Sequence, residues 1–314
     1  ILTLGIYRFW AKTNIRQYLW SNTHFDDEPF EYTGTGGELF MGALIVFLIM
    51  MPMTFGIVYA MGYFSKLYPD VGPFFIVALY PFMLFLVGVA LYRAQVYRMS
   101  RTSWRGIRGA QLPGSRAYGW LTLKYAVLYF ISFGLLAPYI ICRMWNFVMN
   151  NKRMGSGVFQ CDVKSKPLFK VWIITWLGAM ATLGGLGAAM YYALMSQQVG
   201  LFVLCYLLTI VAIVGVFIWF QAALLNHLLH GLRFQNIQVN FAISVKDMFI
   251  VSFVNFMILM ISFGLGAPFI TQRWIRIISE RTTFSGQLDF SEIAQSPEVG
   301  PRFGEGLVEA FDIG

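Results

Sequence analysis

Charged side chains are scarce in this 314-residue sequence. They make up 12% of it, about half the share of an ordinary soluble domain, whereas hydrophobic residues make up 58%. Between Leu39 and Ile278 the only acids are Asp70, Asp162 and Asp247, against eighteen lysines and arginines. This composition excludes a soluble cytosolic enzyme, a disulfide scaffold and a disordered chain, and it predicts a membrane protein.

Cysteine and histidine are also rare, with three of each. Cys142, Cys161 and Cys205 are odd in number and widely spaced, so we expect free thiols. His227 and His230 have no acid or cysteine nearby in sequence, which favours a structural role over a metal site. So few carboxylates allow no catalytic acid–base set within the apolar region. We therefore expect no enzymatic activity, no metal and no cofactor.

Long apolar segments occur four times, at 39–64, 71–90, 168–195 and 201–225. Each has about the 20 residues needed to cross a hydrocarbon core of roughly 30 Å. The short links inside each pair are nearly uncharged, while the outer ends carry most of the basic residues. The positive-inside rule then places these basic connections in the cytoplasm. Because apolar spans separate the basic patches, we expect no nucleic-acid partner.

Two shorter apolar runs, at 118–133 and 248–263, end in nearly the same pattern. One closes with Ser-Phe-Gly-Leu-Leu-Ala and Pro138, the other with Ser-Phe-Gly-Leu-Gly-Ala and Pro268. Glycine can end one helix in a left-handed conformation, and proline can open the next. We expect a broken helix followed by a basic, aromatic amphipathic helix on the bilayer surface. Each apolar run either crosses the membrane fully or dips in and returns.

The break pattern recurs along the chain. Gly5, Gly134 and Gly264 are equivalent at offsets of 129 and 130 residues, which indicates internal repeats. The chain then divides into a first repeat, a second repeat, a partial third repeat and an acidic, glycine-rich tail, at 1–130, 131–260, 261–295 and 296–314. The first copy lacks the apolar run that precedes the others, so we expect the native product to extend upstream of Ile1.

Short polar segments between the helices alternate with a period of two, which predicts strands. They occur at 30–32, 158–163, 234–241 and 284–290. The glycine-rich run before Glu38 lacks the lysine of a phosphate loop and instead favours a lead-in to a helix, whose N-terminus suits the Glu38 carboxylate. The predicted fold class is an all-α polytopic membrane protein with internal repeats, broken helices, surface amphipathic helices and small cytoplasmic β segments.

Nine basic residues are candidates for binding a lipid phosphate or a partner protein. Arg8, Lys12 and Arg16 share one helix face through their i, i+4, i+8 spacing. Lys124 lies inside an apolar run, where an ionisable group is costly and suggests function. The other candidates lie on basic connections or on the surface helices: Arg105, Arg108, Arg143, Arg273 and Arg276. Alternatively, these are ordinary interfacial anchors whose side chains snorkel towards water.

Several motifs together resemble a known family. The run from Thr3 to Trp10, the Phe-Glu-Tyr-Thr-Gly run that ends at Gly34, and the Thr-Ser-Trp-Arg-Gly run that ends at Gly106 are similar to the YjgN family of bacterial inner-membrane proteins, a domain of unknown function. The resemblance covers almost the whole chain. It implies multi-pass placement in the bacterial inner membrane, and it supplies no catalytic motif. It also implies a membrane-bound metallopeptidase of the HExxH type as a candidate partner, although this sequence has no such motif itself.

Two kinds of function are compatible with these features. The first is a non-catalytic docking or regulatory module in a membrane complex, with phospholipid and another membrane protein as partners. The alternative is a transporter or channel for a lipid-like or small amphiphilic substrate, since internal repeats and broken helices are typical of transporters. Ion-coupled carriers usually place an acid or a histidine at mid-membrane, and the four long segments contain neither. We therefore favour the docking module.

Overall fold

The structure is a computed structural model that describes residues 6–68 and 72–286. The chain divides into two compact units. Unit 1 contains the described part of 1–130 together with 147–160, and unit 2 contains 131–146 and the described part of 161–287. The predicted acidic tail at 296–314 and the end of the last predicted strand lie outside the described residues.

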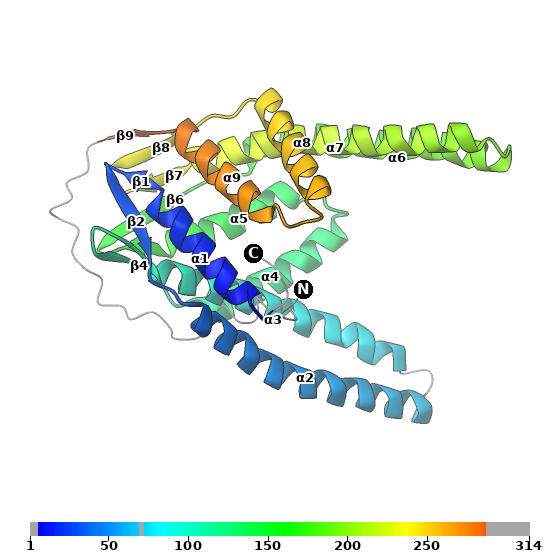
Figure 1. Cartoon of the computed structure of the whole chain (residues 1–314). Helices are drawn as coiled ribbons and strands as arrows, with labels where there is room; N and C mark the ends of the chain where they lie inside the picture. The colour runs from blue at the N-terminus through cyan, green and yellow to red at the C-terminus, as the bar shows by residue number, and fades with distance from the viewer. Residues whose placement is uncertain (1–5, 69–71, 287–314) are drawn as a thin grey trace. The chain divides into compact units, whose positions relative to one another are not determined.

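Helices and short strands alternate along the chain (Figure 1). The helices are α1 (Arg8–Ser21), α2 (Gly36–Leu67), α3 (Gly72–Ser100), α4 (Ser115–Ile131), α5 (Ala137–Asn150), α6 (Lys166–Met195), α7 (Val199–His230), α8 (Val245–Ile261) and α9 (Ala267–Arg281). The strands are β1 (His24–Phe25), β2 (Glu28–Tyr32), β3 (Thr102–Trp104), β4 (Ile107–Gln111), β5 (Lys152–Met154), β6 (Gly157–Cys161), β7 (Leu232–Phe234), β8 (Ile237–Phe241) and β9 (Thr282–Ser285). The order helix, β-hairpin, two long helices, β-hairpin, helix occurs first in α1–α4 and again in α5–α8.

Two-residue turns close the β-hairpins. Asp26 and Asp27 join β1 to β2 with φ of 51° and 61°, and Arg105 and Gly106 join β3 to β4 with φ of 50° and 74°. Left-handed residues at both positions match the natural twist of an antiparallel pair. These turns make an antiparallel meander of β1–β6 in unit 1, and β7–β9 form a second meander in unit 2.

The helical hairpins α2–α3, α4–α5 and α8–α9 each return to a strand beside the one they left. Gln111 at the end of β4 pairs with Lys152 at the start of β5, so the segment that contains α4 and α5 returns to the same sheet. Phe241 of β8 likewise pairs with Thr282 of β9, on either side of α8 and α9. Helices α4 and α8 have 17 residues each, about the lower limit for a helix that crosses a membrane. In both places the helix that follows brings the chain back to the neighbouring strand.

The breaks between these helices occur where the sequence predicts them. Phe133 and Phe263 both have φ of 49°, and Gly134 and Gly264 follow with φ of 79° and 86°. Left-handed backbone ends a helix by directing the chain away from its axis. In unit 2, Trp172 Nε1 also donates a hydrogen bond to Gly134 O at 3.0 Å. The predicted helix breaks are confirmed.

The predicted fold class, an all-α polytopic membrane protein, is wrong. Nine antiparallel strands lie within residues 6–68 and 72–286, so the protein combines helices with sheet. Of the helices in that part of the chain, two rather than four are long and apolar enough to cross a membrane, α6 and α7. Helices α2 and α3, of 32 and 29 residues, cover the other two predicted spans. The physical reason for the sheet lies in the left-handed turns, which fold the polar connections into paired strands instead of leaving them as isolated β segments.

Candidate functional site

The basic stripe on α1 lies against its own unit. Arg8, Lys12 and Arg16 are half-buried. Arg16 Nη1 donates a hydrogen bond to Tyr32 Oη at 3.2 Å, and its guanidinium lies 5.8 Å from the centre of the Tyr32 ring. Tyr32 is itself buried, so Arg16 helps to fix α1 on β2. The predicted common face on α1 therefore exists, and its last member has a structural contact.

Arg105 and Arg108 lie on the β3–β4 hairpin of unit 1, and both are exposed. Arg105 Nη2 forms an ion pair with Asp26 Oδ2 at 3.0 Å, and the guanidinium stacks 4.7 Å from the Trp104 ring centre. The pair joins the turn of one β-hairpin to the turn of the next. Arg105 thus links two turns, while Arg108 presents its charge on the surface of the same hairpin.

The remaining candidates are spread over other helices. Lys124 of α4 is exposed, with its ammonium 5.8 Å from the Tyr125 ring centre. In unit 2, Arg143 of α5 lies 5.5 Å from the Tyr139 ring centre. Arg273 and Arg276 lie on α9, where Arg276 is 3.9 Å from Glu280 in an exposed pair. An exposed pair of this kind contributes little stability. The structure therefore keeps Arg8, Lys12 and Arg16 on one face of α1 and places Arg105 and Arg108 on one β-hairpin, as two separate groups of unit 1.

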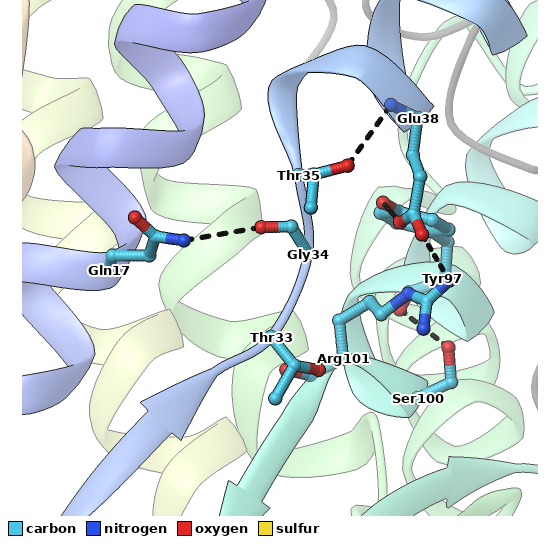
Figure 2. Close-up of polar contacts among 8 residues, drawn as sticks. All are labelled: Gln17, Thr33, Gly34, Thr35, Glu38, Tyr97, Ser100 and Arg101. Carbon is cyan, nitrogen blue, oxygen red and sulfur yellow. Dashed lines mark hydrogen bonds and ion pairs between the residues drawn. The ribbon is translucent and has the colours of Figure 1, made fainter.

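A cluster that sequence reasoning missed ties together the ends of the long helices in unit 1 (Figure 2). Glu38, in the first turn of α2, accepts a hydrogen bond from Tyr97 Oη at 2.6 Å and one from Arg101 Nη2 at 2.8 Å. Thr35 Oγ1 accepts from the Glu38 N–H, as expected of an N-cap. Burial, and then the bond to Glu38, raise the pKa of Tyr97 above its usual value. The predicted helix start at Glu38 is confirmed, and its carboxylate also binds the end of α3.

Unit 2 makes the same junction with different chemistry. His227 is equivalent to Tyr97 at an offset of 130 residues. Its Nε2 lies 2.7 Å from the backbone oxygen of Lys164, just before α6. Gly231 stands where unit 1 has Arg101, and Val163 fills the space beside it. The charged cluster is therefore specific to unit 1, and a comparison of the two repeats at an offset of 130 is the signal that could have found it.

The cysteines lie in the interior as free thiols, as predicted. Burial raises the pKa of the Cys142 thiol to about 11, and it also raises the pKa of Cys161. At neutral pH these thiols carry little of the thiolate that reacts or binds metal. No group of three or more metal-binding side chains occurs in the part of the chain that the structure describes.

The α6–α7 hairpin of unit 2 exposes an extensive apolar surface. The two helices lie side by side (Figure 1), and few of their side chains are buried, among them Ala179, Ala193 and Cys205. Large apolar side chains point outwards on both helices, among them Ile174, Leu177, Leu183, Tyr191, Leu204 and Val211. Water disfavours apolar area by about 25 cal/mol per Å², so a continuous surface of this kind requires lipid or protein around it.

These features define a mixed α/β protein in which β-hairpins alternate with helical hairpins. The chain matches, over residues 1–310, a family described as bacterial protein of unknown function (DUF898). The inner membrane protein YjgN of Salmonella typhimurium is 24% identical over 93% of this chain and 84% of that protein. Those of Escherichia coli O157:H7 and K12 are each 27% identical over 43% of this chain and 31% of their own length. No solved structure matches.

The chain belongs to the DUF898 family, and the predicted resemblance to YjgN proteins is confirmed.

Proposed function

We propose that this protein is a multi-pass protein of the bacterial inner membrane that acts as a non-catalytic docking or regulatory module in a membrane complex. The observation that carries the proposal is the exposed apolar surface of the α6–α7 hairpin. The names of the relatives, each an inner membrane protein, support the location. Phospholipid and another membrane protein are the proposed partners.

Charge supports one orientation of this hairpin. Lys164, Lys166 and Lys170 flank the start of α6, and Arg233 follows the end of α7. The link between the two helices, 196–198, is uncharged. Under the positive-inside rule the β-hairpin end then faces the cytoplasm and the link faces the periplasm.

A glycine-rich face on α6 supports docking of a further helix. A side chain added at Gly184, Gly185 or Gly187 would meet nothing within 4 Å. In lipid, small residues allow two helices to approach closely, which is where packing between membrane helices is strongest. We place the partner's helix on this face.

Labelling of introduced cysteines tests the orientation. Gly200→Cys places a thiol at the start of α7 beside the link, and Asn236→Cys places one in the β7–β8 turn; both positions are exposed. We expect a membrane-impermeant maleimide to label Gly200→Cys in intact cells and Asn236→Cys only after permeabilisation. The unmodified chain, whose cysteines are buried, is the control. Labelling of both positions from the same side would contradict the proposal.

A substitution on the glycine face tests docking. Gly185→Ile adds a branched side chain where the partner's helix would approach. We expect this variant to lose the higher-mass complex that the native protein forms in mildly solubilised membranes. Leu208→Ile, an exposed position on α7, preserves side-chain volume and should leave the complex intact. A complex that is unchanged by Gly185→Ile would exclude this face as the docking surface.

A further inference from the structure

Two polar residues face each other where the second and third β-hairpins of unit 1 join. Gln111, the last residue of β4, is directly opposite Lys152, the first residue of β5. Directly opposed residues of an antiparallel pair have side chains on the same face, about 5 Å apart at Cβ. Tyr92 of α3 lies beside this pair, with Gln111 and Asn151 next to its hydroxyl. Arg98, two turns further along α3, is close enough to Lys152 for their charges to interact.

Several polar atoms of this group have no partner. Gln111 is 5% exposed, and neither its Oε1 nor its Nε2 has a hydrogen bond of normal geometry. Among the described residues the Lys152 ammonium has no hydrogen bond or ion pair. Burial, and then the charge of Arg98, lower the pKa of Lys152 to about 8. Each unpaired buried group costs about 1–3 kcal/mol, so the fold alone gives no reason to keep them.

The same junction elsewhere in the chain is built without this polar group. In unit 2 the equivalent of Gln111 and Lys152, at an offset of 130 residues, is the pair Phe241 and Thr282. Arg98 corresponds there to Leu228. These residues belong to a region where Ala222, Phe241 and Leu225 pack as an apolar cluster. The preceding junction of unit 1 pairs Tyr32 with Thr102. An aromatic residue opposite threonine thus suffices to join two β-hairpins.

We propose that the cluster of Arg98, Gln111 and Lys152 binds a phosphate group. Two positively charged side chains, Arg98 and Lys152, lie close together here. The electrostatic influence on Lys152 comes from Arg98 and not from a carboxylate, so the site favours an anion. Phosphate oxygens accept from ammonium, guanidinium and amide N–H groups together, which gives strong charge-assisted bonds. Lys152 is half-buried, so a ligand can reach its ammonium from the surface. The phosphate belongs either to an anionic lipid headgroup or to a free phosphate in the cytoplasm.

Thermal unfolding of the full chain in detergent micelles tests the site. One arm titrates inorganic phosphate at constant ionic strength, with chloride as the control. The other adds phosphatidylglycerol to the micelles, with phosphatidylcholine as the control. We expect the melting temperature to rise with at least one of the two ligands. Lys152→Met, which keeps the side-chain length, should weaken this response at least tenfold while leaving the ligand-free protein at least as stable. Lys246→Met removes an exposed charge of unit 2 and should respond as the unmodified chain does.

The two arms separate the sources of phosphate. A response to inorganic phosphate assigns the site to a free phosphate group, and a response to phosphatidylglycerol alone assigns it to a lipid headgroup. Gln111→Leu provides a second variant with the same expected loss, should Lys152→Met fold poorly. The proposal is overturned if neither ligand shifts the melting temperature, or if the variants respond as the unmodified chain does. The site needs unit 1 alone, so cysteine labelling and complex formation test the docking role separately.

Discussion

Asn226, near the end of α7, binds both backbone polar groups of Ile243. Its Nδ2 donates to Ile243 O at 2.9 Å, and its Oδ1 accepts from the Ile243 N–H at 2.8 Å. Asn146 of α5 makes the same pair of bonds to Val163, at 3.0 and 3.1 Å. In each case the side chain closes a loop of 17 residues around a β-hairpin. An amide is the one side chain that offers a donor and an acceptor in this geometry.

Replacement of Asn226 by leucine should destabilise the protein substantially. Ile243 is buried, so its N–H and C=O would each lose their hydrogen-bond partner without gaining water. The expected loss is about 2–4 kcal/mol, because each unsatisfied buried group costs about 1–3 kcal/mol. Denaturant unfolding in micelles measures it. Asn240→Leu removes an exposed bond to Ser285 and should cost less than about 1 kcal/mol, so equal losses would contradict this role for Asn226.

Removal of one hydroxyl from the charged cluster of unit 1 should also be measurable. Tyr97→Phe deletes the hydrogen bond to Glu38 Oε2 at 2.6 Å but keeps the buried ring, which is 1% exposed. A hydrogen bond to a charged acceptor contributes about 1.5–3 kcal/mol to stability. We expect Tyr97→Phe to lose an amount towards the lower end of this range, because Glu38 keeps its ion pair with Arg101. The melting temperature of this variant measures the effect. Tyr18→Phe makes the same change at an exposed position and should leave the melting temperature unchanged.

Local sequence signals predicted the local structure well. The glycine and proline pattern around Gly134 and Gly264 indicated breaks that the backbone confirms, because left-handed φ depends on the residues at that point. Alternation around Phe30 and Val158 indicated strands that became β2 and β6. Strands β1, β3 and β5 were missed because their two or three residues are too few to reveal a period, and the five-residue strand β4 was missed as well.

Features that depend on distant residues could not be predicted in this way. The bond between Glu38 and Arg101 joins positions 63 residues apart, and it exists only because α2 and α3 return to one end. The opposition of Gln111 and Lys152 likewise depends on strand register. The positions of the nine basic candidates were visible in the sequence, but the contacts of Arg16 and Arg105 with aromatic rings were not.

A close approach of two helices in unit 1 makes a third prediction. A Cβ on Gly119 of α4 would lie 2.7 Å from Val89 and 2.9 Å from Phe85, both on α3. Gly119→Val should therefore force the helices apart and lower stability by about 1–3 kcal/mol, the usual cost of overpacking. Gly187→Val provides the matched control, because nothing lies within 4 Å of that position. The free energies of unfolding of the two variants, measured under identical conditions, give the comparison. Similar stabilities would show that α3 and α4 can separate freely.

The lowered pKa of Lys152 makes the stability of the protein depend on pH. In the folded chain this pKa is about 8, against the ordinary value of 10.5. The unfolded chain therefore binds more protons than the folded chain between these two values, and stability rises with pH across that window. Below pH 8 the folded chain bears the full penalty of the buried charge, at most about 3 kcal/mol. Lys152→Met lacks the titrating group, so its unfolding free energy should change less between pH 8 and 10.5 than that of the unmodified chain.

A bound phosphate would favour the charged ammonium and raise the pKa of Lys152. This would reduce the pH dependence of the unfolding free energy in the unmodified chain and leave that of the variant unaffected. Equal slopes in both proteins, with and without phosphate, would contradict the burial of this charge.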